Sequence, residues 1–165
     1  MRVALAGLSL SDLPDIPELL PVEPTKNPGS VLFVCNHNSI RSPMGEALMR
    51  QRHGNHVFTA SAGIRIGETD PFVDAVMAEM GVDMGDHEPK ALEDLDEGYF
   101  DLVVTLSPTA HHVALERAVV DATEVVYWPS ADPTVVTGAR EAKMDAYRDV
   151  RDRLAERIEA LFTAS

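Results

Sequence analysis

The residues best suited to chemistry in this sequence are a cysteine and an arginine six positions apart. Cys35 is the only cysteine in 165 residues, and it follows the apolar run VLFV at positions 31–34. Arg41 comes six residues later, Ser42-Pro43 then opens a candidate helix, and the intervening loop is Asn36, His37, Asn38, Ser39 and Ile40. A thiolate is favoured beside an arginine at a helix start, and the N–H groups of such a loop bind phosphate-like oxyanions. The segment therefore predicts a nucleophile within an oxyanion-binding loop.

Two alternatives for this cysteine have to be weighed. A lone cysteine after an apolar strand is often a small buried side chain without a reaction. A zinc site built on Cys35 and His37 is disfavoured because no further thiol and no paired-histidine motif accompanies them. We favour a functional cysteine because strand, polar loop, arginine and helix start occur together, and we predict no metal and no cofactor. His111 and His112 follow another helix start and are predicted to face solvent.

The composition is that of an ordinary globular domain, with 45% hydrophobic and 25% charged residues. The net charge of −13 argues against nucleic acid as a partner, because binding its phosphates needs clustered lysine and arginine. A single cysteine allows no internal disulfide and indicates a reducing, cytoplasmic compartment. No apolar run approaches the ~18 residues of a membrane span, and the N-terminal stretch is a poor signal peptide, so no membrane association is predicted.

The N-terminal residues differ from the rest of the chain. Prolines recur at positions 14, 17, 21, 24 and 28. Since proline cannot continue a helix, we predict an extended leader over residues 1–29 and one domain over residues 30–165. The alternative is an arm that docks on the partner subunit of a homodimer through Leu13, Ile16, Leu19 and Leu20.

From residue 30 onward, candidate strands alternate with candidate helices. The apolar and turn patterns predict strands at 31–34, 56–62, 101–106 and 123–128, and helices at 43–51, 70–81, from 108 onward and 140–162. Residues 82–99 read as irregular, with one short helical turn around 91–95. We therefore predict an α/β fold of three αβα layers around a short, about four-stranded parallel sheet, with the active-site loop between the first strand and the first helix.

The last predicted helix has one continuous apolar face, formed by Tyr147, Val150, Leu154, Ile158 and Leu161. In parallel sheets, ligands bind at the carboxyl ends of the strands. Cys35 ends the first strand and Asp132 follows the last, so we expect this topology to bring the two side chains together.

Residues 31–48, VLFVCNHNSIRSPMGEAL, resemble the active-site segment of the low-molecular-weight protein tyrosine phosphatases and the related thiol-dependent arsenate reductases. Ser61-Ala62-Gly63 is similar to the serine-alanine-glycine turn of the family, Asp132-Pro133 to its aspartate-proline loop, and residues 87–92 to its middle histidine segment. These matching segments occur in the same order as in the family, and together they extend over residues 30–162. Val34 precedes the cysteine where the larger classical tyrosine phosphatases have histidine.

The resemblance implies a role for each matching residue. Cys35 would attack phosphorus and form a cysteinyl-phosphate, and Arg41 would hold two of the phosphoryl oxygens. Asp132 would protonate the leaving group and then activate water. Residues 36–42 would form the phosphate-binding loop, with Ser42 donating to the thiolate and Asn38 in a left-handed conformation supported by Ser61. His87 is expected to be a structural hydrogen-bonding residue.

Several positions depart from the family pattern. His37 stands where glycine is usual, and Ile40 replaces a second cysteine. Thr134-Val135 and residues 64–67 lack the aromatic side chains that wall the pocket of the tyrosine phosphatases. Residues 128–133 and 147–152 are more similar to the arsenate reductase branch, which normally uses further cysteines of its own.

We therefore predict a cysteine-dependent phosphomonoester hydrolase acting on a phosphorylated protein or a small phosphomonoester. The first alternative is an arsenate reductase, which would need an external small thiol or a redoxin because this chain has no second cysteine. The second alternative is a non-enzymatic oxyanion-binding module on the same fold.

Overall fold

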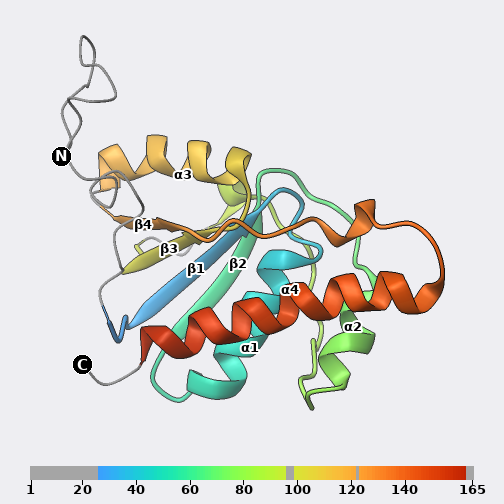
Figure 1. The fold of residues 1–165 in the computed structure, drawn as a ribbon. Helices are drawn as coiled ribbons and strands as arrows, with labels where there is room; N and C mark the ends of the chain where they lie inside the picture. The colour runs from blue at the N-terminus through green and yellow to red at the C-terminus, as the bar shows by residue number, and fades with distance from the viewer. Residues whose placement is uncertain (1–25, 96–98, 122, 163–165) are drawn as a thin grey trace, which may run out of the picture.

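A four-stranded parallel sheet forms the centre of the molecule, as predicted. The computed structural model describes residues 26–95, 99–121 and 123–162. In the order β2-β1-β3-β4, the strands are β2 (Phe58–Gly63), β1 (Ser30–Cys35), β3 (Leu102–Thr105) and β4 (Glu124–Tyr127) (Figure 1). In the central strand, Val34 lies opposite Ala62 on one side and Thr105 on the other. All four carboxyl ends therefore meet at one edge.

Helices cover both faces of this sheet, which confirms the three-layer arrangement (Figure 1). On one face lie α1 (Arg41–His53) and α4 (Arg140–Leu161), with α2 (Pro71–Ala78) packed against α4. The other face is covered by α3 (Pro108–Asp121). Two short 3-10 turns complete the described elements, η3 (Leu92–Asp94) and η4 (Pro133–Val135).

The helix boundaries differ from the prediction by a few residues, for reasons of local geometry. Helix α1 begins at Arg41, two residues before the predicted start, because proline is tolerated in the first helical turn. Helix α2 ends at Ala78 rather than at Gly81, and Gly81 adopts a positive φ of 72° that continues the turn away from the helix.

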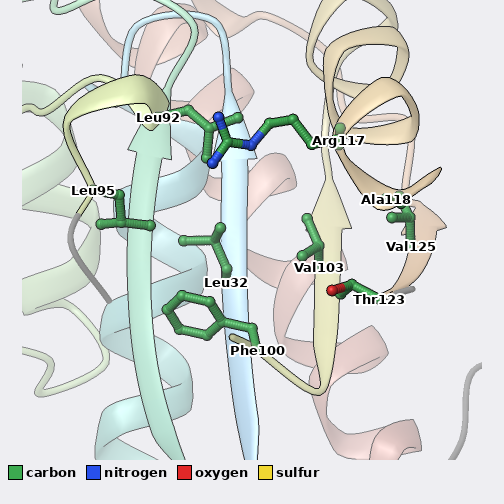
Figure 2. A pocket seen from close by; sticks show the side chains of 10 residues that line it. Leu32, Leu92, Leu95, Phe100, Val103, Arg117, Ala118, Thr123 and Val125 are labelled. Atoms are coloured by element: carbon green, nitrogen blue, oxygen red, sulfur yellow. The ribbon is translucent and has the colours of Figure 1, made fainter. Parts of the chain in front are cut away.

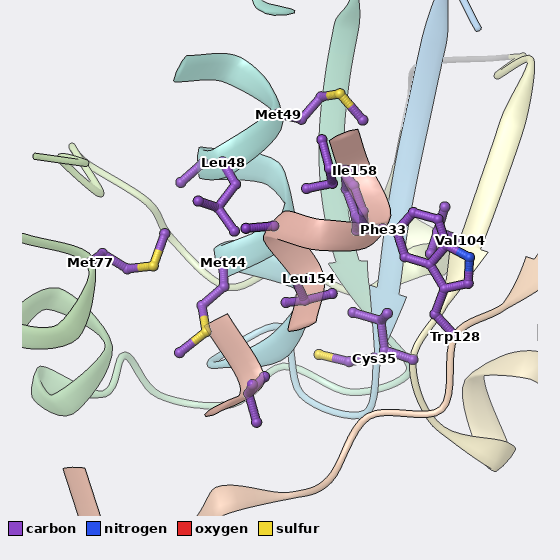
Figure 3. Close-up of a cluster of buried hydrophobic side chains, with 14 of the residues drawn as sticks. Phe33, Cys35, Met44, Leu48, Met49, Met77, Val104, Trp128, Leu154 and Ile158 are labelled. Atoms are coloured by element: carbon purple, nitrogen blue, oxygen red, sulfur yellow. The ribbon is translucent and has the colours of Figure 1, made fainter. Parts of the chain in front are cut away.

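Alternating side chains of β1 divide the core into two clusters. Val31, Phe33 and Cys35 point into the cluster on the α1/α4 face, whereas Leu32 and Val34 point into the cluster on the α3 face. Figure 3 shows side chains from β1, α1 and α4 converging in the first cluster, with Cys35 among them. The predicted apolar face of α4 is confirmed, because its members are at most 4% exposed: Tyr147, Val150, Leu154, Ile158 and Leu161.

Close packing between α1 and β1 holds the helix start against the sheet. A Cβ atom added at Gly45 would come within 2.7 Å of the Phe33 ring. Only a glycine lets the helix backbone approach an aromatic ring this closely. The position of the α1 N-terminus, and of the loop before it, therefore depends on this glycine.

The two ends of the domain meet at the C-terminal end of α4. The backbone N–H of Asn27 donates to the Leu161 carbonyl over 2.8 Å, and Lys26 Nζ donates to the Ala160 carbonyl over 2.7 Å. Gly29 is held next to β3, because its N–H donates to Asp101 Oδ2 over 2.9 Å. The remaining residues of the predicted leader, 1–25, lie outside the described residues. Among the helices that the structure describes, none has the length and apolar character needed to span a bilayer.

The prediction that His111 faces solvent is wrong. Its Nδ1 lies 2.8 Å from Thr105 Oγ1, and its ring stacks on Tyr127 with the centroids 4.7 Å apart. Burial lowers the pKa of His111, so the neutral imidazole is favoured in this position. Its neighbour His112 is exposed, as predicted.

Candidate active site

The strand edge positions the segments that carry the predicted site residues. Cys35 is the last residue of β1, and the chain leaves β4 through the loop that leads to Asp132. Backbone bonds extend the sheet past its formal ends: Leu106 N–H donates to the Val34 carbonyl over 2.9 Å, and Trp128 N–H donates to the Thr105 carbonyl over 2.8 Å. These bonds bring the loops after β1, β3 and β4 to the same edge.

The loop after β1 directs its carbonyl groups toward a neighbouring segment. Ile64 N–H donates to the carbonyl of Cys35 over 3.1 Å, and Gly67 N–H donates to that of His37 over 2.9 Å. Within the described residues, the backbone N–H groups of residues 36–40 have no protein acceptor. Buried and half-buried N–H groups are normally paired, so this loop can accept an oxyanion as the missing partner.

Glycine is required where the neighbouring segment touches the loop. A Cβ atom at Gly63 would lie 2.6 Å from Asn38 N and 2.7 Å from the His37 carbonyl carbon. Real Cβ atoms do not approach backbone this closely, so only glycine allows the serine-alanine-glycine turn to support the loop.

Cys35 lies at the base of this loop and is only 2% exposed. Its Sγ is 2.9 Å from Ser42 Oγ, and the Ser42 backbone N–H points at the same sulfur over 3.4 Å. Ser42 is in the first turn of α1, where free N–H groups and the helix dipole favour negative charge. The Ser42 hydroxyl, a backbone N–H and a helix N-terminus thus converge on the sulfur.

Asn38 holds the loop in shape with its side-chain amide and its backbone carbonyl. Its φ is +55°, the left-handed conformation expected for this residue, which asparagine tolerates better than most side chains. Its Nδ2 donates to Ser42 Oγ and to Ser61 Oγ, both over 2.9 Å. Its Oδ1 accepts from the Lys90 backbone N–H over 3.0 Å, and its carbonyl lies 3.0 Å from His87 Nε2. His87 therefore has the structural position that was predicted for it.

Glu46 completes this network, and the sequence interpretation missed it. The Ser61 hydroxyl donates to Glu46 Oε1, the other carboxylate oxygen pairs with Arg50, and His87 Nδ1 is 4.0 Å away. Glu46 is almost completely buried and lies four residues after Ser42 on α1. An acid on the same helix face as Ser42, within an otherwise apolar stretch, is the signal that could have identified it.

Arg41 is 8% exposed, and its guanidinium reaches the loop that carries Asp132. Its Nη1 donates to the Ser130 carbonyl over 3.0 Å, and the Ser130 N–H donates to the Leu106 carbonyl over 3.1 Å. The arginine is therefore fixed between two strand ends. Ser130 was not predicted, because its contribution is a backbone carbonyl that no side-chain pattern reveals.

Asp132 is exposed and close enough to the loop for its charge to interact with Arg41 and His37. Burial would raise the pKa of its carboxyl. Two hydrogen bonds from Thr134 to Oδ1 and the charges of Arg41 and His37 act in the opposite direction and leave the pKa below its ordinary value. Among the described residues, no hydrogen bond joins Asp132 to the loop itself, and Thr134 is a partner that the sequence interpretation missed.

The remaining loop residues occupy distinct positions. Asn36 accepts a hydrogen bond from Ser107 Oγ over 2.7 Å, which connects the loop to the start of α3. His37 is exposed at the rim, while Ser39 and Ile40 are half-buried. In the described part of the chain, no group of three or more histidine, cysteine, aspartate or glutamate side chains is arranged to hold a metal ion.

Aliphatic side chains occupy the two flanking segments, 64–67 and 134–135, which contain no aromatic residue. Val135, three residues after Asp132, is 74% exposed, and Ile66, next to Gly67, is 61% exposed. The charge of Asp132 also acts on Tyr147 of α4, whose pKa is raised by burial, by its hydrogen bond to Asp70 and by the charges of Asp70 and Asp132.

Comparison with known proteins agrees with this geometry. Residues 30–165 match the family model described as low molecular weight phosphotyrosine protein phosphatase. The low molecular weight protein-tyrosine-phosphatase of Streptomyces coelicolor is 36% identical over 82% of this chain and 88% of its own length. The arsenate reductase of Halalkalibacterium halodurans is 32% identical over 78% of this chain and 91% of its own length.

The fold agrees as well. A solved arsenate reductase in the phosphate binding state superimposes with a TM-score of 0.68 and 25% identity, covering 80% of this chain and 95% of the other. The chain therefore belongs to the low molecular weight phosphotyrosine protein phosphatase family, which contains both phosphatases and arsenate reductases.

Proposed function

We propose that this protein is a phosphomonoester hydrolase that works through a cysteinyl-phosphate, with Cys35 as nucleophile, Arg41 as oxyanion ligand and Asp132 as general acid and base. The observation that carries the proposal is the position of Asp132 within electrostatic reach of Arg41. An ester leaving group needs a proton, and arsenate reduction has no equivalent organic leaving group. A carboxyl group beside the oxyanion ligand is the group that ester cleavage requires.

In the first step the Cys35 thiolate attacks phosphorus from the base of the loop. The S–P bond forms while the ester P–O bond breaks, and the electron pair of the broken bond stays on the leaving oxygen. Asp132 supplies the proton that neutralises this oxygen. The loop N–H groups and the Arg41 guanidinium hold the other phosphoryl oxygens as their charge redistributes.

In the second step water attacks phosphorus and Asp132, now a carboxylate, takes its proton. The S–P bond breaks, and its electron pair returns to Cys35 as a thiolate. The Ser42 hydroxyl and backbone N–H lie 2.9 and 3.4 Å from that sulfur, so they stabilise the leaving thiolate. Inorganic phosphate and the free enzyme result.

Substrate binding adjusts the proton affinity of Asp132 in the required direction. In the free protein its pKa is low because the Thr134 hydrogen bonds and the charges of Arg41 and His37 outweigh burial. A phosphoryl dianion bound to Arg41 neutralises part of that positive charge and adds negative charge nearby. Both effects raise the pKa of the carboxyl and favour its proton-donating form in the complex.

Arsenate reduction is the second candidate, favoured by relatives such as the arsenate reductase of Halalkalibacterium halodurans. Cys35 would displace water from arsenate to form an S–As bond. An external thiol would then attack the Cys35 sulfur, so that arsenite leaves with two electrons and a mixed disulfide remains. The chain contains no second cysteine, so this route needs a small thiol or a redoxin.

The decisive experiment compares the two substrates side by side. Phenyl phosphate is supplied alone, and arsenate is supplied with and without glutathione or a glutaredoxin system, with Cys35→Ser as the control for each. Hydrolysis of the ester alone supports the proposal. Reduction of arsenate only with thiol, without ester hydrolysis, would replace it with the reductase. Tight phosphate binding without either turnover would favour an oxyanion-binding module.

A further inference from the structure

His37 is an exposed side chain on the rim of the oxyanion loop, and the proposed reaction gives it no role. Its imidazole forms no hydrogen bond with any residue in the described ranges 26–95, 99–121 and 123–162. The ring is therefore available for a contact with a bound molecule. The neighbours of His37 indicate which part of a substrate it would meet.

The first neighbour is Gly67, in the flanking segment 64–67. Its backbone N–H donates to the His37 carbonyl over 2.9 Å. A Cβ atom added at Gly67 would lie 2.7 Å from the Cβ atom of His37 and 2.5 Å from Ser39 Oγ. Only glycine leaves room for such a contact, so the His37 side chain begins directly against the backbone of this segment.

The second neighbour is Asp132, on the loop that continues into the other flanking segment, 134–135. The charge of His37 is one of the two side-chain charges that lower the pKa of Asp132, and Arg41 supplies the other. Salt and water screen exposed charges over roughly 10 Å, so the imidazole lies near this loop. With its base at Gly67 and its charge close to Asp132, the ring lies between the two flanking segments.

These segments contain no aromatic side chain that could contact a leaving group, and their aliphatic side chains Ile66 and Val135 are 61% and 74% exposed. A leaving group held beside Asp132 would therefore meet the imidazole of His37. Histidine rings in this chain stack well on planar groups. The ring of His53 lies 3.8 Å from that of Phe162, and the ring of His111 lies 4.7 Å from that of Tyr127.

Building on the proposed ester hydrolysis, we propose that His37 is a specificity-determining residue whose ring contacts the leaving group of the substrate. Esters of planar alcohols should then bind better than esters of aliphatic alcohols. The contact involves the part of the substrate beyond the phosphoryl group, so it acts on the choice of substrate and not on the thiolate. The loop itself would supply a planar surface that the flanking segments lack.

The test measures binding of two phosphonates to the full-length protein by calorimetry. Benzylphosphonate and methylphosphonate share the oxyanion group, but only the first carries a ring, and the P–C bond of both resists the proposed hydrolysis. The readout is the ratio of their two affinities. His37→Gly should lower this ratio by about three- to tenfold, the size of a typical aromatic contact. A general change in the loop would alter both affinities and cancel in the ratio.

Two further variants separate the ring from its charge. His37→Phe keeps a planar ring and should preserve the ratio, whereas His37→Lys keeps a positive charge without a ring and should lower the ratio as glycine does. Because His37 is exposed, these changes leave the buried core unaltered. An unchanged ratio in His37→Gly, or a ratio kept by lysine and lost by phenylalanine, would overturn the proposal. Failure of the wild type to hydrolyse phenyl phosphate would refute the proposed function instead, and the phosphonate ratio would still decide the role of His37.

Discussion

The two faces of the sheet differ in how completely they are covered. Among the residues whose burial is described, 24 form one buried cluster on the α1/α4 face, whereas seven form the cluster on the α3 face. Two helices lie against the first face and one against the second (Figure 1). A pocket of about 260 Å³ lies on the second face, lined by described residues of α3 and of β1, β3 and β4 (Figure 2).

This difference bears on how the site is supported. Helix α1 supplies Arg41, Ser42 and Glu46, so these side chains around the loop belong to a helix of the well-packed face. A site whose supporting residues are fixed by packing keeps its geometry more accurately than one carried by loosely packed elements. From the start of α3, Ser107 donates a hydrogen bond to Asn36 of the loop. Variants at the site and on each face of the sheet test this division.

Cys35→Ser should abolish turnover while leaving the packing of the α1/α4 face intact, because the two side chains are of similar size. A serine hydroxyl does not ionise near neutral pH, so the nucleophile is lost although the loop N–H groups and Arg41 remain. Hydrolysis of phenyl phosphate should fall to background, while calorimetry with inorganic phosphate should still detect binding. If the serine variant hydrolysed phenyl phosphate at a rate above background, the assignment of Cys35 as the nucleophile would be contradicted.

Asp132→Asn should slow hydrolysis according to the leaving group. General acid assistance is typically worth ~10²–10⁴ in rate, and a good leaving group needs little of it. The loss should therefore be much larger with phenyl phosphate than with 4-nitrophenyl phosphate, measured as kcat under saturating substrate. The same small loss on both esters would mean that Asp132 serves only as the N-cap of the η4 turn.

Leu154→Ala and Leu32→Ala compare the two faces directly. Leu154 is 1% exposed within the large cluster, and its truncation should cost about 2–5 kcal/mol of unfolding free energy. Leu32 already borders the pocket, so its truncation removes fewer contacts and should cost an amount near the lower end, about 2 kcal/mol. Urea unfolding of both variants measures the difference, and equal losses would show that the two faces are equally well packed.

Glu79→Gln should have the smallest effect, and one that depends on pH. Hydrogen bonds from Arg148, and to a smaller extent from Arg151, lower the pKa of Glu79 from 4.5 to about 2. These ion pairs link the end of α2 to α4. Because the folded pKa is the lower one, the stabilisation is present above the unfolded pKa and is lost as the pH falls through the folded value. The stability advantage of the wild type should be constant above pH 4.5 and shrink toward pH 2 in thermal unfolding. A pH-independent difference would exclude the ionic origin.

Much of the fold could be predicted because it depends on apolar spacing. The run at 31–34 predicted β1, and the spacing of Tyr147, Val150 and Leu154 predicted the buried face of α4. The position of His111 on α3 could not be predicted in this way, because its partners Thr105 and Tyr127 lie on β3 and β4. Only the sheet order brings those strands next to the start of α3.

The predicted loop residues come together in the structure, whereas several of their partners had no sequence signal. Asn38, Ser42 and Ser61 form one network with Cys35 at its base. Ser130 and Lys90 contribute backbone groups, which every residue carries, so their identities do not reveal the contact. Such partners become visible only when the path of the chain is known.

The hydrogen bond between Asn27 and Leu161 has a consequence for engineering the domain. A domain whose two ends are adjacent can be joined end to end by a short peptide and opened elsewhere, or inserted as a unit into a loop of another protein. Joining residues 27 and 162 with a few glycines, and opening the chain in the exposed turn near Gly138, would move the break away from both β1 and α1. The circularly permuted chain should then retain the order of its strands and the geometry of its loop.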